Sequence, residues 1–136
     1  MIGIYFPLGS GFGGFDPLFR MHEPFSLLKP TYFNHAHNDF AEIALDGGLP
    51  GLLVLALALG WWLIASVRVW RAPNPGHVIL LARVGSAVLS LVMVASIVDY
   101  PGRTPLVMAT IVLAAIWLAD GARAASATLP RQNHHL

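Results

Sequence analysis

The most polar cluster of this 136-residue chain is the segment HAHND, residues 35–39. Histidine titrates near neutral pH, so His35 and His37 are candidates for a general base. In an extended segment the side chains of residues i and i+2 point the same way, so both rings can face one cavity. The alternative is a pair of solvated surface histidines without a chemical role.

A metal site is a second possible use of the same residues. His35, His37 and Asp39 are similar to the first ligands of the metallo-β-lactamase pattern H-x-H-x-D-H, but its last position is occupied here by Phe40. A zinc site usually needs three or four protein ligands, and the only other nearby histidine is His22. We therefore expect no metal and no other cofactor. A metal-dependent membrane hydrolase remains the weaker alternative.

The residues after the histidines have the pattern of a short helix. Asp39 and Glu42 have the spacing of a capping box, in which Asp39 would be the N-cap. The expected helix covers residues 40–45 and ends at Gly47 and Gly48. Helix capping alone is thus the simplest explanation for the polar pair before Phe40.

The glycine-rich stretch GSGFGG, residues 9–14, formally matches the nucleotide-binding pattern G-x-G-x-x-G. That pattern is informative only between a strand and a helix of a βαβ unit. The following Phe15-Asp16-Pro17 is unfavourable for a long helix, and no second strand is predicted. We interpret the glycines as a flexible turn at the end of a preceding membrane helix.

The composition is that of a membrane protein. Hydrophobic residues make up 56% of the chain and charged residues 11%, and the mean hydropathy is +0.65. Soluble domains carry about 25% charged residues. The expected fold class is therefore all-α and integral to a membrane. The net charge of +1 argues against a nucleic-acid partner, and the absence of cysteine excludes disulfides and thiol chemistry.

Three apolar segments are candidates for membrane spans, since a span needs about 20 residues. They cover approximately residues 49–69, 77–98 and 104–120, and tight Pro- and Gly-containing links join them. Residues 1–48 then form a polar loop with a short interfacial helix, and residues 121–136 form a tail. Arg83 lies inside the second span, where it either reaches the membrane surface with its long side chain or has a function.

The charges predict the orientation. Positive residues prefer the cytoplasmic side, which places the N-terminal loop in the periplasm and the C-terminus in the cytoplasm. The arginines on the expected cytoplasmic side are Arg68, Arg71, Arg123 and Arg131. The acidic residues on the other side are Asp16, Glu23, Asp39, Glu42, Asp46 and Asp99. Since two spans separate HAHND from the link DYPGRTP, residues 99–105, both segments should lie on the same face.

Three sequence motifs follow one another along the chain: PLGSGFGGF, then HAHNDFAEIALDGGLPGLLVL, then DYPGRTP. Together they resemble the C-terminal part of the O-antigen ligase and O-antigen polymerase superfamily, over the chain up to about residue 120. The pattern H-x-H-N-x-x-x-E-x-x-x-x-x-G-L-P-G carries most of the resemblance.

The resemblance implies a multi-pass protein of the bacterial inner membrane. It further implies a metal-independent glycosyltransferase that moves a glycan from an undecaprenyl-pyrophosphate donor to an acceptor sugar. The acceptor is lipid A-core in ligases and another lipid-linked glycan in polymerases, and both remain open. His37 would act as the base on the acceptor hydroxyl, with His35 in support.

Arginines of this family neutralise the pyrophosphate of the donor, and Arg103 is the matching candidate. Arg20 and Lys29 are weaker candidates. The expected substrate-binding residues are Asn38, Asp39, Asp99, Arg20 and Arg103.

Most of the upstream spans of such enzymes are missing from the chain. We therefore expect it to be the C-terminal part of the enzyme, with a larger partner that supplies the upstream helices. The alternative is a membrane remnant or subunit without catalysis.

Overall fold

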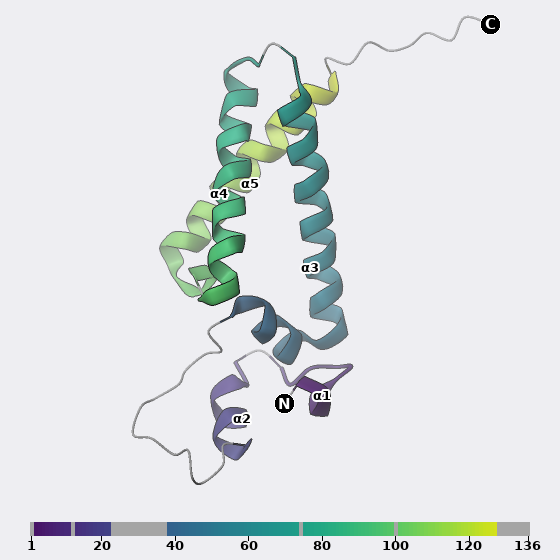
Figure 1. Ribbon diagram of the computed structural model, residues 1–136, viewed down its shortest axis with the longest axis vertical. Coiled ribbons are helices and arrows are strands. Elements are labelled where there is room, and N and C mark those ends of the chain that lie inside the picture. Colours follow the sequence, from purple (N-terminus) through teal and green to yellow (C-terminus); the bar gives the residue numbers. More distant parts are fainter. Residues whose placement is uncertain (1, 12, 23–37, 74, 100, 128–136) are drawn as a thin grey trace, which may run out of the picture. The chain divides into compact units, whose positions relative to one another are not determined.

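The computed structural model describes residues 2–11, 13–22, 38–73, 75–99 and 101–127. Its elements in chain order are α1 (Ile2–Tyr5), α2 (Phe15–His22), α3 (Asp39–Arg71), α4 (His77–Val98), the short 3-10 helix η2 (Pro101–Arg103) and α5 (Pro105–Ala127) (Figure 1). No strand occurs among these residues. The predicted all-helical fold class is confirmed.

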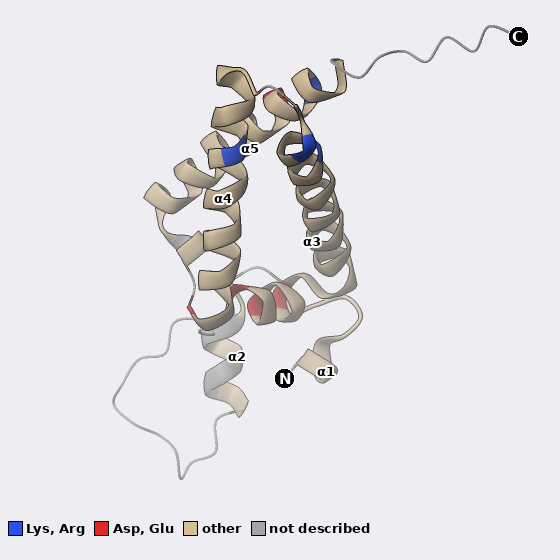
Figure 2. Cartoon of the chain, turned by 45° about the horizontal axis from the view of Figure 1, so that its top comes forward, with Lys and Arg blue, Asp and Glu red and all other residues tan. Residues whose placement is uncertain are grey.

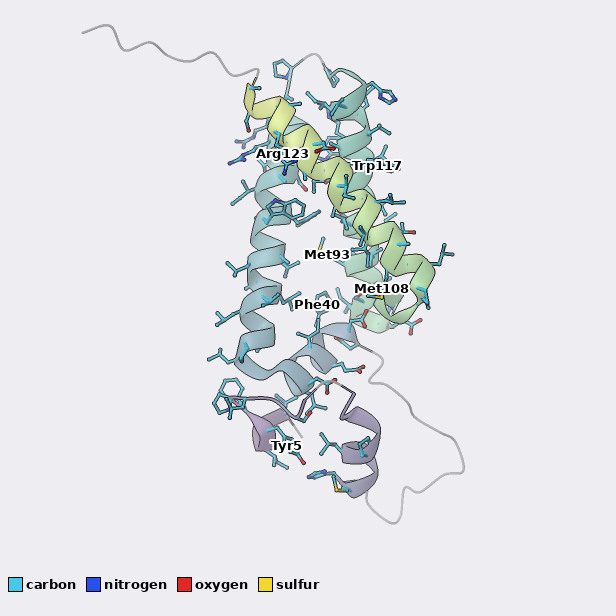
Figure 3. All side chains as sticks on the ribbon, turned by 180° about the vertical axis from the view of Figure 1, so that it is seen from behind. Tyr5, Phe40, Met93, Met108, Trp117 and Arg123 are labelled. Carbon is cyan, nitrogen blue, oxygen red and sulfur yellow. The ribbon has the colours of Figure 1, made fainter. Side chains whose placement is uncertain are left out.

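Three of the helices, α3, α4 and α5, are long and apolar enough to cross a membrane. The last of them continues to Ala127, well past the expected end of the third span. The added turns are rich in alanine, which has the highest helix propensity. Arg123 in these turns (labelled in Figure 3) forms an exposed ion pair with Asp120. Its Nη1 lies 3.1 Å from Asp120 Oδ1.

The chain divides into two compact units, which we describe separately. Unit 1 comprises Met1–Ala58 and Met93–Thr104, and unit 2 comprises Leu59–Val92 and Pro105–Leu136. The helices α3 and α4 therefore contribute residues to both units. The residues expected to act in catalysis or to bind substrate all belong to unit 1.

Within unit 2, α3 and α4 are joined by a chain of hydrogen bonds between polar side chains. Trp70 Nε1 donates to Ser86 Oγ at 3.3 Å, and Ser86 Oγ donates to Ser66 Oγ at 2.9 Å. Both serines are buried, at 7% and 3% exposure for Ser66 and Ser86. Polar side chains of this kind hold membrane helices together, since the surrounding lipid offers them no alternative partner.

The contact between α4 and α5, also within unit 2, depends on small residues. A Cβ atom added at Gly121 would overlap the Cβ of Ala82, and one added at Gly85 would overlap the backbone oxygen of Ala114. Close backbone approach through glycine and alanine is the usual way in which membrane helices pack. Substitutions at either glycine would therefore push the two helices apart.

Arg83 binds the end of α3 through its guanidinium group. Its Nε donates to the backbone oxygen of Val69 at 3.0 Å, and its Nη2 donates to that of Ala72 at 3.1 Å. The guanidinium also lies 5.4 Å from the ring centroid of Trp70. The last carbonyls of a helix have no partner within the helix, and a cation there also balances the helix dipole. Arg83 is thus a structural residue of the turn between α3 and α4.

This arrangement predicts that Arg83→Leu destabilises the protein. Two backbone oxygens lose a charged donor, and a hydrogen bond to a charged group contributes about 1.5–3 kcal/mol. The matched control is Arg123→Leu, which removes an exposed ion pair worth about 0–1 kcal/mol. We expect the unfolding midpoint in detergent micelles to fall clearly for Arg83→Leu and little for Arg123→Leu. Equal midpoints for the two variants would contradict the assigned role.

Candidate functional site

The helix α3 is broken at Gly48, whose backbone angles (φ 53°, ψ −144°) are not helical. The sequence anticipates this break, since Gly47 and Gly48 were expected to end a short helix. Pro50 follows within the first turn of the next helical segment, where its missing N–H removes no hydrogen bond. A helix break leaves carbonyls on one side and N–H groups on the other without helical partners.

The glycine-rich turn supplies those partners. Ser10 N donates to the oxygen of Leu45 at 2.9 Å, and Gly11 N donates to that of Asp46 at 3.0 Å. On the other side of the break, Leu49 N donates to the oxygen of Pro7 at 2.8 Å. Residues 7–11 therefore cap both sides of the break. The predicted turn is present, but it binds α3.

The backbones of the two segments approach so closely that only glycine fits. Gly9 has a φ of 84°, and a Cβ atom there would overlap the oxygen of Asp46. Conversely, a Cβ atom on Gly48 would overlap the oxygen of Pro7. Both residues also occupy the left-handed region, which side chains disfavour. The two glycines are thus required at this contact for two independent reasons.

The side chain of Asp46 fastens the same turn. It is 3% exposed. Its Oδ2 accepts from Gly13 N at 3.1 Å, and its Oδ1 lies 3.4 Å from Ser10 Oγ. The turn is followed by α2. The ring of His22 in α2 packs edge-on against the ring of Tyr5 in α1 (labelled in Figure 3), and the ring centroids are 6.2 Å apart. The N-terminal elements of unit 1 are thereby connected to the first part of α3.

The N-cap of α3 is Asn38, one residue before the expected one. Its Oδ1 accepts from Ala41 N at 3.0 Å, and its backbone oxygen accepts from Glu42 N at 3.2 Å. These are the bonds of an N-cap residue, so the prediction that Asp39 is the cap is wrong. Asparagine and aspartate cap helices about equally well, and the spacing to Glu42 alone selected the wrong one.

Asn38 provides the cap, so the side chain of Asp39 is available for other contacts. It binds residues far along the chain. Its Oδ2 accepts from Ser96 Oγ at 2.9 Å and from Gly102 N at 3.3 Å. Beside it, Asn38 Nδ2 donates to the backbone oxygen of Ile97 at 2.8 Å. Within unit 1, the start of α3 therefore lies against the end of α4 and the 3-10 helix η2.

This contact brings together two segments that the sequence assigned to one site. Asn38 directly follows His37 in the chain, and Gly102 directly precedes Arg103. Asp99, exposed, lies between the two contact points and donates its backbone N–H to the oxygen of Ala95 at 2.9 Å. Neither Ser96 nor Gly102 was singled out in the sequence. A serine near the end of an apolar span was the available signal.

The structure does not describe the side chains of several residues that were expected in the site. His35, His37 and Lys29 lie outside the described residues. Arg20 in α2 and Arg103 in η2 are described by their backbone alone. Their roles, and the substrate contacts expected of Asn38, Asp39 and Asp99, stay predictions. Among the described residues, histidines and carboxylates form no group of three that could hold a metal.

The charges along α3 are separated by sign. Its first turn carries Asp39 and Glu42, and its last turn carries Arg68 and Arg71. Figure 2 shows the acidic residues in red and the basic ones in blue. This order matches the stabilising direction of the helix dipole. It is also the distribution on which the predicted orientation rests.

The fold defines a helical, multi-pass membrane protein. The profile of the O-antigen ligase family matches residues 1–56, which contain α1, the glycine-rich turn, α2 and α3 through its break at Gly48. The predicted resemblance to this superfamily is thereby confirmed over residues 1–56, and its continuation to about residue 120 stays a prediction. No curated protein and no solved structure matches the chain.

The glycine contact generates a prediction with an internal control. Gly48→Ala combines a positive φ (53°) with an overlap on the backbone oxygen of Pro7, whereas Gly11→Ala also has a positive φ (90°) but nothing within 4 Å of the added Cβ. The backbone conformation alone costs roughly 1–2 kcal/mol per residue. We expect Gly48→Ala to lower the unfolding midpoint in micelles considerably more than Gly11→Ala. If the two variants unfold together, the turn does not bind the break as described.

Proposed function

We propose that the chain forms the acceptor-activating part of a glycosyltransferase of the O-antigen ligase type in the bacterial inner membrane. The donor is a glycan on undecaprenyl pyrophosphate, and the acceptor is lipid A-core or another lipid-linked glycan. The observation that carries the proposal is the contact of Asp39 with Ser96 and Gly102, which joins the histidine-containing segment to the turn before Arg103.

The proposed reaction needs one base and one cationic group. The oxygen of the acceptor hydroxyl attacks the anomeric carbon of the donor sugar, and His37 accepts the proton of that hydroxyl. The bond between the anomeric carbon and the pyrophosphate oxygen breaks, and undecaprenyl pyrophosphate leaves with the electron pair. Arg103 stabilises the negative charge of the leaving group, for which a guanidinium is well suited.

The position of these residues beside apolar helices fits an amphiphilic substrate. The donor lipid lies in the bilayer, while its reactive bond lies at the level of the headgroups. Along the chain, the histidine segment directly precedes α3, and Arg103 lies between α4 and α5; these three helices are long and apolar enough to cross a membrane. A base and a cation at this level reach the reactive bond, and no charge has to be buried in the hydrocarbon.

The first test is His37→Ala in the full-length protein, expressed in its host. Loss of a general base lowers a rate by about 10²–10⁴-fold, so we expect glycan attached to lipid A-core, or extended glycan, to disappear. The measurement is the glycan profile of the envelope at matched protein level. The control is His77→Ala, which changes an exposed histidine at the start of α4 in unit 2.

An unchanged glycan profile in His37→Ala would overturn the proposal and favour a non-catalytic membrane subunit. Loss of activity on treatment with a chelator, together with bound zinc, would instead favour the metal-dependent hydrolase.

The proposed orientation is tested by labelling single cysteines, since the chain contains none. A cysteine at Asn34 should react with a membrane-impermeant thiol reagent added to the periplasmic side. A cysteine at Asn74, in the link between α3 and α4, should react only after the membrane is permeabilised. The reverse labelling pattern would contradict the placement of the site in the periplasm.

A further inference from the structure

We propose that Asp39 is a positioning residue for Arg103: through Ser96 and Gly102 it holds the turn before Arg103 against the start of α3, and it makes no contact with the glycan. This inference rests on the proposed function. It replaces the expectation that Asp39 binds substrate.

The geometry of Asp39 supports this role. Both donors, Ser96 Oγ at 2.9 Å and Gly102 N at 3.3 Å, bind the same oxygen, Oδ2. Ser96 is only 7% exposed, and hydrogen bonds strengthen where water is excluded. Asn38 adds a second connection to the same end of α4 through Ile97. All three bonds join residues more than 50 positions apart in the chain, so they fix tertiary structure rather than a local turn.

The position of Asp39 in the chain explains why this contact matters for the reaction. His37 precedes it by two residues, and its partner Gly102 is bonded covalently to Arg103. The bond from Gly102 N to Asp39 Oδ2 therefore sets where the backbone of Arg103 begins relative to the start of α3. A misplacement of reacting groups by about 1 Å can lower a rate about 10²-fold.

Neither donor requires a negative charge on its acceptor. A serine hydroxyl and a backbone amide are neutral, and the carbonyl oxygen of asparagine can accept from both. A carboxylate that bound sugar hydroxyls or balanced a cation through its charge would not tolerate loss of that charge. The two roles of Asp39 therefore differ in their response to Asp39→Asn.

The experiment uses the full-length protein in lipid nanodiscs, with lipid-linked glycan as donor and lipid A-core as acceptor. It compares Asp39→Ala, Asp39→Asn, Arg103→Ala and the double variant Asp39→Ala/Arg103→Ala by kcat and KM. We expect Asp39→Ala to lower kcat by about 10- to 100-fold, with little change in the KM of the donor. Asp39→Asn should stay within about threefold of the wild type, because its oxygen keeps both bonds.

The double variant distinguishes positioning from a general structural role. If Asp39 acts through Arg103, its loss should add less than about threefold to the loss caused by Arg103→Ala. Fully multiplicative losses would overturn the proposal, and so would an Asp39→Asn variant as slow as Asp39→Ala. The control is Asp120→Ala, an exposed acidic residue of unit 2, which should transfer glycan at the wild-type rate.

A further variant covers the case in which Asp39→Ala does not accumulate in the membrane. Ser96→Ala removes one of the two donors, so we expect a smaller fall in kcat that again vanishes in the Arg103→Ala background. An unchanged kcat for Ser96→Ala would overturn the proposal.

Failure of the proposed function looks different, because His37→Ala and Arg103→Ala would then both transfer glycan normally. Normal transfer by Arg103→Ala alone, beside an inactive His37→Ala, would overturn only the positioning role.

Discussion

The break of α3 at Gly48 is the constraint on which unit 1 depends. It leaves backbone groups without helical partners directly before a long apolar helix, where unsatisfied groups are costly. The glycine-rich turn satisfies them from both sides, with Ser10 and Gly11 donating to the first segment and Pro7 accepting from the second. That solution explains the glycines at positions 9 and 48 and the buried Asp46 that holds the turn.

Several polar side chains within the apolar helices have defined partners, and they serve different purposes. Ser66 and Ser86 join α3 to α4, and Arg83 caps the end of α3. Asp39, by contrast, joins the start of α3 to the end of α4 and to η2, beside the residues proposed to act on substrate. A polar residue in an apolar helix is thus not a site by itself. Its partner decides whether it stabilises a helix end, a helix pair or a functional segment.

The proposed chemistry follows from the same arrangement. A lipid-linked pyrophosphate presents its reactive bond where hydrocarbon meets water, and a base and a cation must meet it at that depth. Short polar segments attached to the ends of long apolar helices satisfy this requirement. In unit 1, hydrogen bonds such as that of Asn38 with Ile97 join the start of α3 to the end of α4. The proposed catalysis therefore depends on contacts between segments far apart in the chain.

The sequence by itself determined the helical membrane fold, the break at Gly47 and Gly48 and the resemblance now confirmed over residues 1–56. Each of these depends on local composition, periodicity or glycine chemistry, which neighbouring residues reveal. Only the tertiary structure decided that Asn38 caps α3, that Asp39 binds Ser96 and Gly102, and that Arg83 binds the end of α3. Capping preferences allow either Asn38 or Asp39, and the partners of Asp39 and Arg83 lie on other elements. Such bonds are selected by packing between distant segments, and no local pattern encodes that packing.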